Sequence, residues 1–505
     1  MAASPVETLI LGSGMAGLTV GALLASAGQR VRILEAHEHP GGYAHSFRMG
    51  PWRLCAQVHY VFGCGEGEAV RTFLRRIGLE GEITFRRLDP DGFDHVVVGE
   101  ERYRIPNGFP LWRDRLLGTF PAYGKEIRAW FRLLEAVAVE LDLLPSEPGP
   151  LDYLCAPLRV PHLLRWRTST LQDVYDHLGI PPRLQAILAG QSGDYLLPPE
   201  KVSFLLHAAL VAGYDRGAWY PDRHYGHLVD ALVGHIVSHP GCAVELQREV
   251  DHIEVARGRV AGVHTTDGET WTAGTYISNI DPTRTIALAD PGTFPPSYVR
   301  GTTYPYSCGS FTLYLGLRGI DLREHGFGSW NVWHYPHDDL NRLYADQVDR
   351  HDLSDPWLFL ATPTLHSDAP GLAPAGHHLL EVATACDHAH FRALKEQGGD
   401  AYLREKVRVR ERILDILEER YVPGLRKHVA LKVVGSATTN ARYCWAPEGN
   451  AYGAALTPAG LRRVPFATPL PNLFLVNATA GYPSVCGTVG AGMRLFDQLG
   501  RCAWT

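Results

Sequence analysis

The first 35 residues contain the feature that most constrains the fold of this chain. Residues 6–11 (V-E-T-L-I-L) predict a buried strand, which runs directly into residues 12–17 (G-S-G-M-A-G), a G-x-G-x-x-G sequence. Residues 18–27 predict an apolar helix closed by Gly28, and residues 31–34 predict a second strand followed by Glu35. This order of strand, glycine turn, helix, strand and acid is typical of a Rossmann-like dinucleotide-binding unit.

Each part of this unit has a physical role. Gly12 permits a tight turn, Gly14 lets the backbone approach a diphosphate, and Gly17 lets the helix pack closely on the strand. The positive end of the helix faces the phosphates. Glu35 is placed to accept hydrogen bonds from both hydroxyls of an adenosine ribose, and its charge disfavours a phosphorylated ribose. A glycine-rich turn of an unrelated α/β protein is the alternative, which the register of strand, helix and acid disfavours.

The glycine motif alone does not separate nicotinamide from flavin dinucleotides, but two further stretches favour flavin adenine dinucleotide (FAD). Soon after Glu35, the paired glycines 41–42 allow a second close backbone approach to a diphosphate, which nicotinamide dehydrogenases usually lack. Residues 472–499 predict a strand, a glycine-rich loop and a helix that Gly500 terminates. The start of that helix, near residues 487–490, directs free N–H groups toward the electron-rich edge of a flavin.

The chain is too long for one ordinary core, so we expect two domains in its 505 residues. The fold class predicted is α/β, with a Rossmann-like FAD-binding domain and a discontinuous α+β substrate (cap) domain. The FAD-binding domain is assigned residues 1–70, 215–300 and 440–505. The cap domain is assigned residues 71–214, which have helical periodicity, and residues 301–439. The second range contains predicted strands at 310–315, 357–362 and 378–385.

Composition excludes several classes of partner and compartment. A net charge of -6 leaves no basic surface for nucleic acid. The nine cysteines are scattered without a C-x-x-C pair, which indicates reduced thiols in the cytoplasm. The apolar start of the chain lacks the cationic residues of a secretory signal, and no apolar stretch is long enough to span a membrane. The number of subunits is left open.

One segment is compatible with a peripheral membrane contact. Residues 157–167 (P-L-R-V-P-H-L-L-R-W-R) interleave leucine, tryptophan and arginine, as segments at a membrane interface do. A half-exposed cap helix with solvated arginines explains the same pattern, and it is the favoured interpretation because the run is short and bounded by prolines.

The candidate catalytic residues come from two stretches. His59 and Tyr60 follow the paired glycines and are expected near a flavin or substrate, although a structural histidine is an equal alternative. Trp445 and Tyr452 are aromatic side chains that can wall a flat apolar substrate. Glu448 is the nearest carboxylate for proton transfer, but a plain turn at residues 447–450 is the favoured interpretation.

Metal binding is not expected. Two sets of potential ligands occur, namely His37, His39 and His45, and farther along Cys386, His388 and His390. The first set lies in a loop beside the predicted phosphate site, and the second lacks a fourth ligand. Neither set has the ligand pattern of a metal centre.

The chain resembles the carotenoid desaturase, carotenoid isomerase and retinol saturase group of the amine oxidase-like flavoproteins. The resemblance lies in the predicted flavin-contacting regions, in residues 217–221 (G-A-W-Y-P) and in residues 451–453. The A-H-S-F stretch at 44–47 and the His59-Tyr60 pair resemble the retinol saturase branch in particular. Three departures stand out. Cys55 and Gln57 replace an acid and a glycine, residues 477–478 (N-A) replace an acid on the ribityl chain, and Tyr43 replaces an arginine.

The resemblance implies non-covalent FAD and hydride chemistry at flavin N5 on a C=C bond of an extended, apolar, polyene-like molecule, by reduction or by desaturation. A redox-neutral cis/trans isomerase, an amine or alcohol oxidase, and a non-enzymatic flavin-binding partner of a lipid biosynthetic complex are the alternatives. NAD(P)H is a candidate external reductant. The residues expected at the cofactor are Gly12, Gly14, Met15, Ala16, Gly17, Glu35, Ala36, Gly41, Gly42, Tyr43, Val250, Asn477, Ala478 and Val489.

Overall fold

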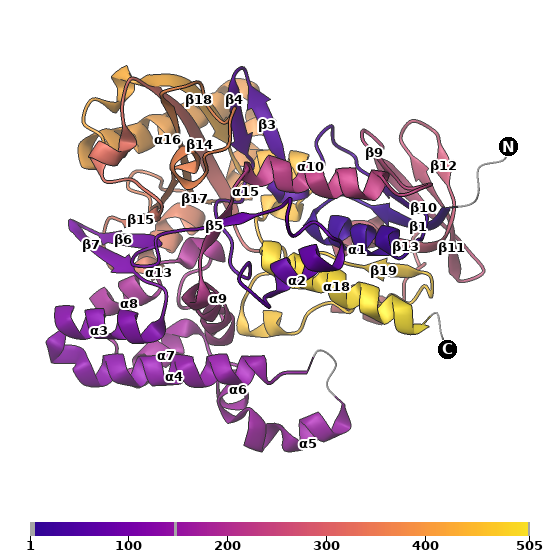
Figure 1. Ribbon diagram of the computed structural model, residues 1–505, viewed down its shortest axis with the longest axis horizontal. Helices are drawn as coiled ribbons and strands as arrows, with labels where there is room; N and C mark the ends of the chain where they lie inside the picture. Colours follow the sequence, from indigo (N-terminus) through magenta and orange to yellow (C-terminus); the bar gives the residue numbers. More distant parts are fainter. Residues whose placement is uncertain (1–5, 146–148, 503–505) are drawn as a thin grey trace.

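The computed structural model describes residues 6–145 and 149–502, and its central element is a five-stranded parallel sheet. In spatial order its strands are β19 (Leu473–Leu475), β13 (Ala273–Ser278), β1 (Val6–Leu11), β2 (Val31–Leu34) and β9 (Ala243–Glu245). The predicted Rossmann-like α/β fold class is confirmed. The first strand therefore lies in the middle of a sheet whose other strands come from distant parts of the sequence (Figure 1).

The two faces of this sheet are covered by different layers. Ile10, Ile33 and Ile277 belong to the core cluster shared with helices α1 (Met15–Ser26), α10 (His224–Val237) and α18 (Val485–Cys502). Leu9 and Tyr276 point to the other side, where they pack on the small antiparallel sheet of β10 (Val250–Ala256), β11 (Arg259–Thr265) and β12 (Thr270–Trp271). The period-2 alternation of strand side chains thus fixes which layer each residue meets.

A seven-stranded sheet forms the second part of the molecule, at the upper left of Figure 1. Its order is β18 (Val429–Gly435), β14 (Gly309–Arg318), β17 (His377–Cys386), β16 (Leu358–Ala361), β15 (Asn331–Tyr335), β6 (Asp94–Val98) and β7 (Glu101–Ile105). Neighbouring strands are antiparallel except β15 and β6. Two long helices pack near its outer side, α15 (His388–Gln397) and α16 (Gly399–Arg420).

Helices surround the lower part of this sheet (Figure 1). They are α3 (Phe109–Thr119), α4 (Gly124–Asp142), α5 (Pro150–Arg159), α6 (Pro161–Trp166), α7 (Leu171–Leu178), α8 (Pro182–Leu188) and α9 (Phe204–Arg216). Short helices elsewhere are α2 (Ala69–Arg76), α11 (Pro282–Ala287), α12 (Pro296–Gly301), α13 (Leu340–Tyr344), α14 (Pro363–His366) and α17 (Ala437–Tyr443). The remaining strands form two small pairs, β3 (Ser46–Met49) with β4 (Trp52–Cys55) and β5 (Phe85–Arg87) with β8 (Trp219–Pro221).

The structure differs from the sequence predictions in three places. Residues 71–214 are not helical throughout, because β6 runs buried beside β15 and β7 closes the sheet edge. The last helix does not end at Gly500 but continues to Cys502. Residues 157–167 do not form one segment, since α5 ends at Arg159 and Pro161 starts α6.

Candidate functional site

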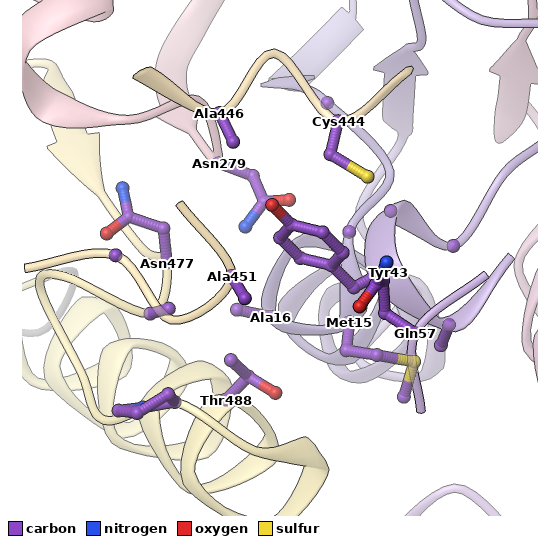
Figure 2. Close-up of a pocket in the computed structure, with 18 of the residues that line it drawn as sticks. Met15, Ala16, Tyr43, Gln57, Asn279, Cys444, Ala446, Ala451, Asn477 and Thr488 are labelled. Carbon is purple, nitrogen blue, oxygen red and sulfur yellow. The ribbon is translucent and has the colours of Figure 1, made fainter. Parts of the chain in front are cut away.

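One cavity of about 610 Å³ extends from the glycine loop after β1 to a cluster of polar side chains in the cap. Its volume is in the range of ordinary ligand sites. Figure 2 shows part of its wall, with Met15, Tyr43, Asn279 and Asn477 around a common space. Residues from four separate stretches of the chain, within 12–62, 194–250, 279–281 and 442–488, therefore meet at one site.

The carboxyl ends of four parallel strands open into this cavity. β1 is followed by the glycine loop, β2 by Glu35, β13 by Asn279 and β19 by Asn477, and all of these line the cavity. In open α/β sheets, ligands bind in the crevice beyond the carboxyl ends of the strands. The cavity lies in that crevice.

The glycines of the loop are required by close packing. Gly12 has a φ of 94°, in the left-handed region, and a Cβ on Gly17 would lie 2.6 Å from the Gly12 carbonyl oxygen. A Cβ on Gly14 would lie 2.5 Å from Asn279 Oδ1, so the Asn279 side chain covers this part of the loop. Asn279 is itself held by a 2.6 Å hydrogen bond from its Nδ2 to the Val476 carbonyl oxygen. Asn279 was not anticipated from the sequence.

Glu35 is fixed at the cavity by three donors. Its Oε2 accepts from the Ser13 N–H at 2.8 Å and from the Ser13 hydroxyl at 2.6 Å, and its Oε1 accepts from the His37 N–H at 3.0 Å. A carboxylate has about four acceptor positions, so about one remains for a ligand hydroxyl. Ser13, a variable position of the glycine motif, thus orients the acid.

The paired glycines pack directly against the first glycine loop. The Gly41 N–H donates to the Ser13 carbonyl oxygen at 3.0 Å, and a Cβ on Gly42 would lie 3.1 Å from the Gly14 Cα. Both glycines have positive φ. Tyr43 then projects into the cavity, where its hydroxyl donates to the Asn450 carbonyl oxygen (Figure 2). Burial raises the pKa of this phenol well above its usual value.

Helix α18 begins at the cavity, two residues before the predicted region 487–490. Ser484, Val485 and Thr488 line the cavity, and the Ser484 hydroxyl accepts from the Gly487 N–H at 3.0 Å. Gly487 is explained by packing, since a Cβ there would lie 2.5 Å from the Tyr482 carbonyl oxygen. The helix N-terminus therefore faces the cavity with its first turn.

The residues predicted to contact the cofactor fall into two groups. Those that line the cavity are Gly12, Gly14, Met15, Ala16, Glu35, Ala36, Gly41, Gly42, Tyr43, Val250, Asn477 and Ala478. Gly17 and Val489 do not line it: Gly17 packs under the loop, and Val489 is buried in the core. Asn477 also has an internal role, because its Oδ1 accepts from the N–H groups of Thr479 and Ala480.

His59 and Tyr60 lie at the inner end of the cavity. His59 Nδ1 is 2.9 Å from Glu381 Oε2, and the Glu381 side chain on β17 is only 2% exposed. The contact leaves Nε2 as the ring nitrogen for a second partner. Tyr60 contacts two buried carboxyl groups, Asp94 and Asp194. Nothing in the sequence spacing pointed to these three acids, since each comes from a distant segment.

Both aromatic candidates line the cavity. Trp445 stacks with the Arg284 guanidinium, whose carbon lies 5.3 Å from the ring centroid. Burial and the charge of Asp194 raise the pKa of the Tyr452 phenol. Glu448 is exposed, has a φ of 53° and does not line the cavity. It occupies the turn that the sequence favoured.

Among the described residues, no group of three or more histidine, cysteine, aspartate or glutamate side chains could hold a metal ion. His37, His39 and His45 contact one another through their rings instead. Burial lowers the pKa of His45 to about 4, which keeps this imidazole neutral. Within the same described ranges, no helix is long and apolar enough to cross a membrane.

Comparisons with known proteins agree with this geometry. A family model described as an NAD(P)-binding Rossmann-like domain matches residues 10–77. The chain is 25% identical to the all-trans-retinol 13,14-reductase of Danio rerio, over 96% of this chain and 84% of the relative. It is 23% identical to prolycopene isomerase 1 of an Oncidium hybrid cultivar, over 92% of this chain and 78% of the relative.

A solved structure shares the fold over the whole chain. Cyclohexylamine oxidase from Brevibacterium oxydans superimposes with a TM-score of 0.62 at 15% identity, covering 98% of this chain and 100% of that one. The predicted resemblance to the retinol saturase and carotenoid isomerase group, on an amine oxidase-like fold, is confirmed. The cavity thus lies at the strand ends of a Rossmann-like domain, where ligands bind in sheets of this kind.

Proposed function

We propose that this oxidoreductase, a relative of all-trans-retinol 13,14-reductases and prolycopene isomerases over most of its length, binds FAD and acts on C=C bonds of an extended apolar polyene. The observation that carries the proposal is the continuous cavity, which joins the strand ends of a Rossmann-like sheet to a buried polar cluster in the cap. A cofactor at one end and a substrate at the other would meet within it.

The residues present fit a flavin dinucleotide. Glu35 keeps an acceptor for an adenosine ribose, and the two glycine loops lie side by side for a diphosphate. The start of α18 supplies N–H groups at the far end of the same cavity. Bound FAD would supply a two-electron hydride donor and acceptor. NAD(P)H, as an external reductant, would dock without its own Rossmann-like unit or pass electrons through another protein, because the described residues contain one such unit and it is the one assigned to FAD.

The inner end of the cavity suits an apolar, flat substrate with a few polar neighbours. Tyr60 and Tyr214 stack with ring centroids 4.6 Å apart, and Phe62 and Leu210 add apolar wall. His59, held by Glu381, and the Tyr60 hydroxyl, in contact with Asp194, are among the polar groups there. In this arrangement the aromatic rings orient the polyene, and the polar groups hold and move protons.

The proposal is tested with purified protein under anaerobic conditions. A yellow protein whose absorbance bleaches with dithionite or NADPH and returns on addition of all-trans-retinol supports it, and amines should not bleach the oxidised protein. The mass of the product separates the possible reactions: a gain of two hydrogens means reduction, a loss means desaturation by the oxidised flavin, and altered absorbance without mass change means isomerisation. A colourless protein that takes up no flavin would refute the FAD assignment, and bleaching of the oxidised flavin by amines would favour an amine oxidase.

Helix α5 supports a further proposal, a peripheral contact with a lipid surface. Leu151, Leu154 and Leu158 lie on one face of α5 and are 74%, 76% and 88% exposed. Figure 1 shows α5 as a projecting element at the edge of the helical layer. Arg159 ends α5 and Arg165 lies on the following helix α6, and such cationic side chains attract anionic headgroups. Such a contact would bring an apolar substrate to the protein from a membrane.

A further inference from the structure

Two buried carboxyl groups share one tyrosine hydroxyl at the inner end of the cavity. The Tyr60 hydroxyl oxygen is 2.7 Å from Asp194 Oδ2 and 3.0 Å from Asp94 Oδ2. Asp94 lies on β6 and is fully buried, whereas Asp194 ends the short helix η3 (Ser192–Asp194) and lines the cavity. Of the two acids, Asp194 is the one on the cavity wall.

The three groups hold an extra proton. The Tyr60 hydroxyl has one hydrogen, so it donates to one carboxylate and not to both. The second short oxygen–oxygen contact is a hydrogen bond only if the other carboxyl carries a proton and donates to the Tyr60 oxygen. Like charges this close also disfavour double ionisation.

The proton is on Asp194 rather than Asp94. Gln191 Nε2 donates to Asp94 Oδ2 at 2.8 Å, and Asn331 Nδ2 donates to Asp94 Oδ1 at 3.1 Å, so each oxygen of Asp94 receives an amide donor that stabilises its charge. Burial raises the pKa of Asp94 to about 6, whereas burial and the charge of Asp94 raise the pKa of Asp194 to about 8. The order of the two pKa values agrees with the donor count.

Burial and the charge of Asp94 favour the neutral form of Asp194 and outweigh the hydrogen bonds of Tyr60 and Tyr214, which lower its pKa. The titratable groups that interact with it are Asp94, Tyr60, Tyr195, Tyr214, Tyr335 and Tyr452. In the described part of the chain, none of the groups that shift the pKa of Asp194 is a cation. His59 belongs to a separate pair with Glu381.

We propose that Asp194 is the catalytic acid that delivers a proton to a substrate carbon, with Tyr60 and Asp94 as positioning residues that keep it protonated. This rests on the proposed function. With the reduced cofactor bound, one alkene carbon would gain a hydride from it, and the neighbouring carbon would gain the Asp194 proton. The C=C π bond, the Asp194 O–H bond and the bond between the cofactor and the transferred hydrogen would break, two C–H bonds would form, and the cofactor would be oxidised by two electrons. Water in the cavity then reprotonates the Asp194 carboxylate.

The stored proton also assigns a direction to the reaction. Reduction requires a protonated acid at rest, whereas desaturation requires a carboxylate that accepts the proton. A resting site that holds the proton on Asp194 therefore suits a reductase of polyenes.

The first test measures the proton itself, on the flavin-loaded protein without substrate. Infrared difference spectra across a pH titration distinguish a protonated carboxyl from a carboxylate. The wild type should lose a protonated-carboxyl band as the pH rises through about 8, and Asp194→Asn should lack this transition. Asp215→Asn is the matched control, since burial raises the pKa of Asp215 to about 6 but Asp215 does not line the cavity. A wild type without the transition overturns the proposal.

The second test measures proton delivery. Protein reduced with dithionite is mixed anaerobically with all-trans-retinol, and flavin reoxidation is followed. Asp194→Asn should slow reoxidation about 100-fold or more, the scale of general acid catalysis, while the flavin spectrum and the rate of reduction stay unchanged. In the wild type the rate should fall as the pH rises through about 8.

Asp94→Asn should move that fall to lower pH, because removing the Asp94 charge lowers the pKa of Asp194. A merely structural role would lower the rate without moving the pH profile. Equal rates for the wild type and Asp194→Asn overturn the proposal. If no polyene reoxidises the wild type, the proposed function fails, and the infrared transition alone decides whether Asp194 stores the proton.

Discussion

Replacing Glu35 by glutamine should weaken FAD binding more than any other isosteric change at the mouth of the cavity. In the structure, Glu35 accepts two hydrogen bonds from Ser13 and one from His37, and about one acceptor position is left for a ribose hydroxyl. Glutamine keeps the shape but turns an NH2 group toward one of these donors. Hydrogen bonds to a charged acceptor are about twice as strong as neutral ones, so the ribose bond loses about 1 kcal/mol.

The misplaced NH2 group adds a second cost. If it faces the His37 N–H, that donor loses its partner, which costs about 1–3 kcal/mol and loosens the loop. Part of this second cost is already present in the protein without FAD and therefore does not weaken binding. We expect a net loss of about 1–2 kcal/mol in binding free energy, or about 5–30-fold in Kd.

Titration of deflavinated protein with FAD, followed by flavin fluorescence, measures the Kd. Glu38→Gln is the control, because Glu38 is a neighbouring exposed acid that does not line the cavity. An unchanged Kd for Glu35→Gln would refute the assignment of Glu35 to the ribose.

Three further outcomes are expected. Gly17→Ala should abolish flavin binding and lower Tm, because its Cβ would meet backbone at 2.6 Å, whereas Gly234→Ala, in open space on α10, should raise stability by up to about 1 kcal/mol. Burial lowers the pKa of His207 to about 3, so the unfolded chain binds a proton that the folded chain excludes. The free energy of unfolding should therefore fall as the pH drops from about 6.5 toward 3, by up to about 1.4 kcal/mol per unit, and His207→Leu should flatten this slope in urea titrations. Leu158→Glu on α5 should reduce co-sedimentation with phosphatidylcholine–phosphatidylserine vesicles without changing flavin content, and equal sedimentation would contradict a lipid-contacting α5.

The parts of the site built from contiguous residues were predictable from the sequence. The strand at 6–11 and the strand at 31–34 were predicted correctly, because apolar periodicity is a local signal. The fold class followed from the same local unit, since a strand, glycine turn, helix and acid in register leave few alternatives.

The parts that depend on long-range contacts were not predictable. Asn279 and Glu381 act through partners in distant segments, and no spacing in the sequence records those contacts. β6 was missed because its partner β15 lies far along the chain and the surrounding segment has helical periodicity. Gly500 was expected to end the last helix, but it has open space around it, and a helix tolerates glycine at a cost of about 1 kcal/mol.

The order of strands in the parallel sheet determines when a growing polypeptide can finish this part of the molecule. Val6 pairs with Ala273, so the first strand synthesised waits for one of its two neighbours, and Tyr276 pairs with Leu473, so that neighbour waits in turn for β19. During translation its open edge presents unpaired N–H and C=O groups to other chains. Such non-local pairing also slows folding. Slower synthesis at low temperature and added chaperones should therefore increase the yield of correctly assembled protein, and shortened chains that end before residue 473 should aggregate.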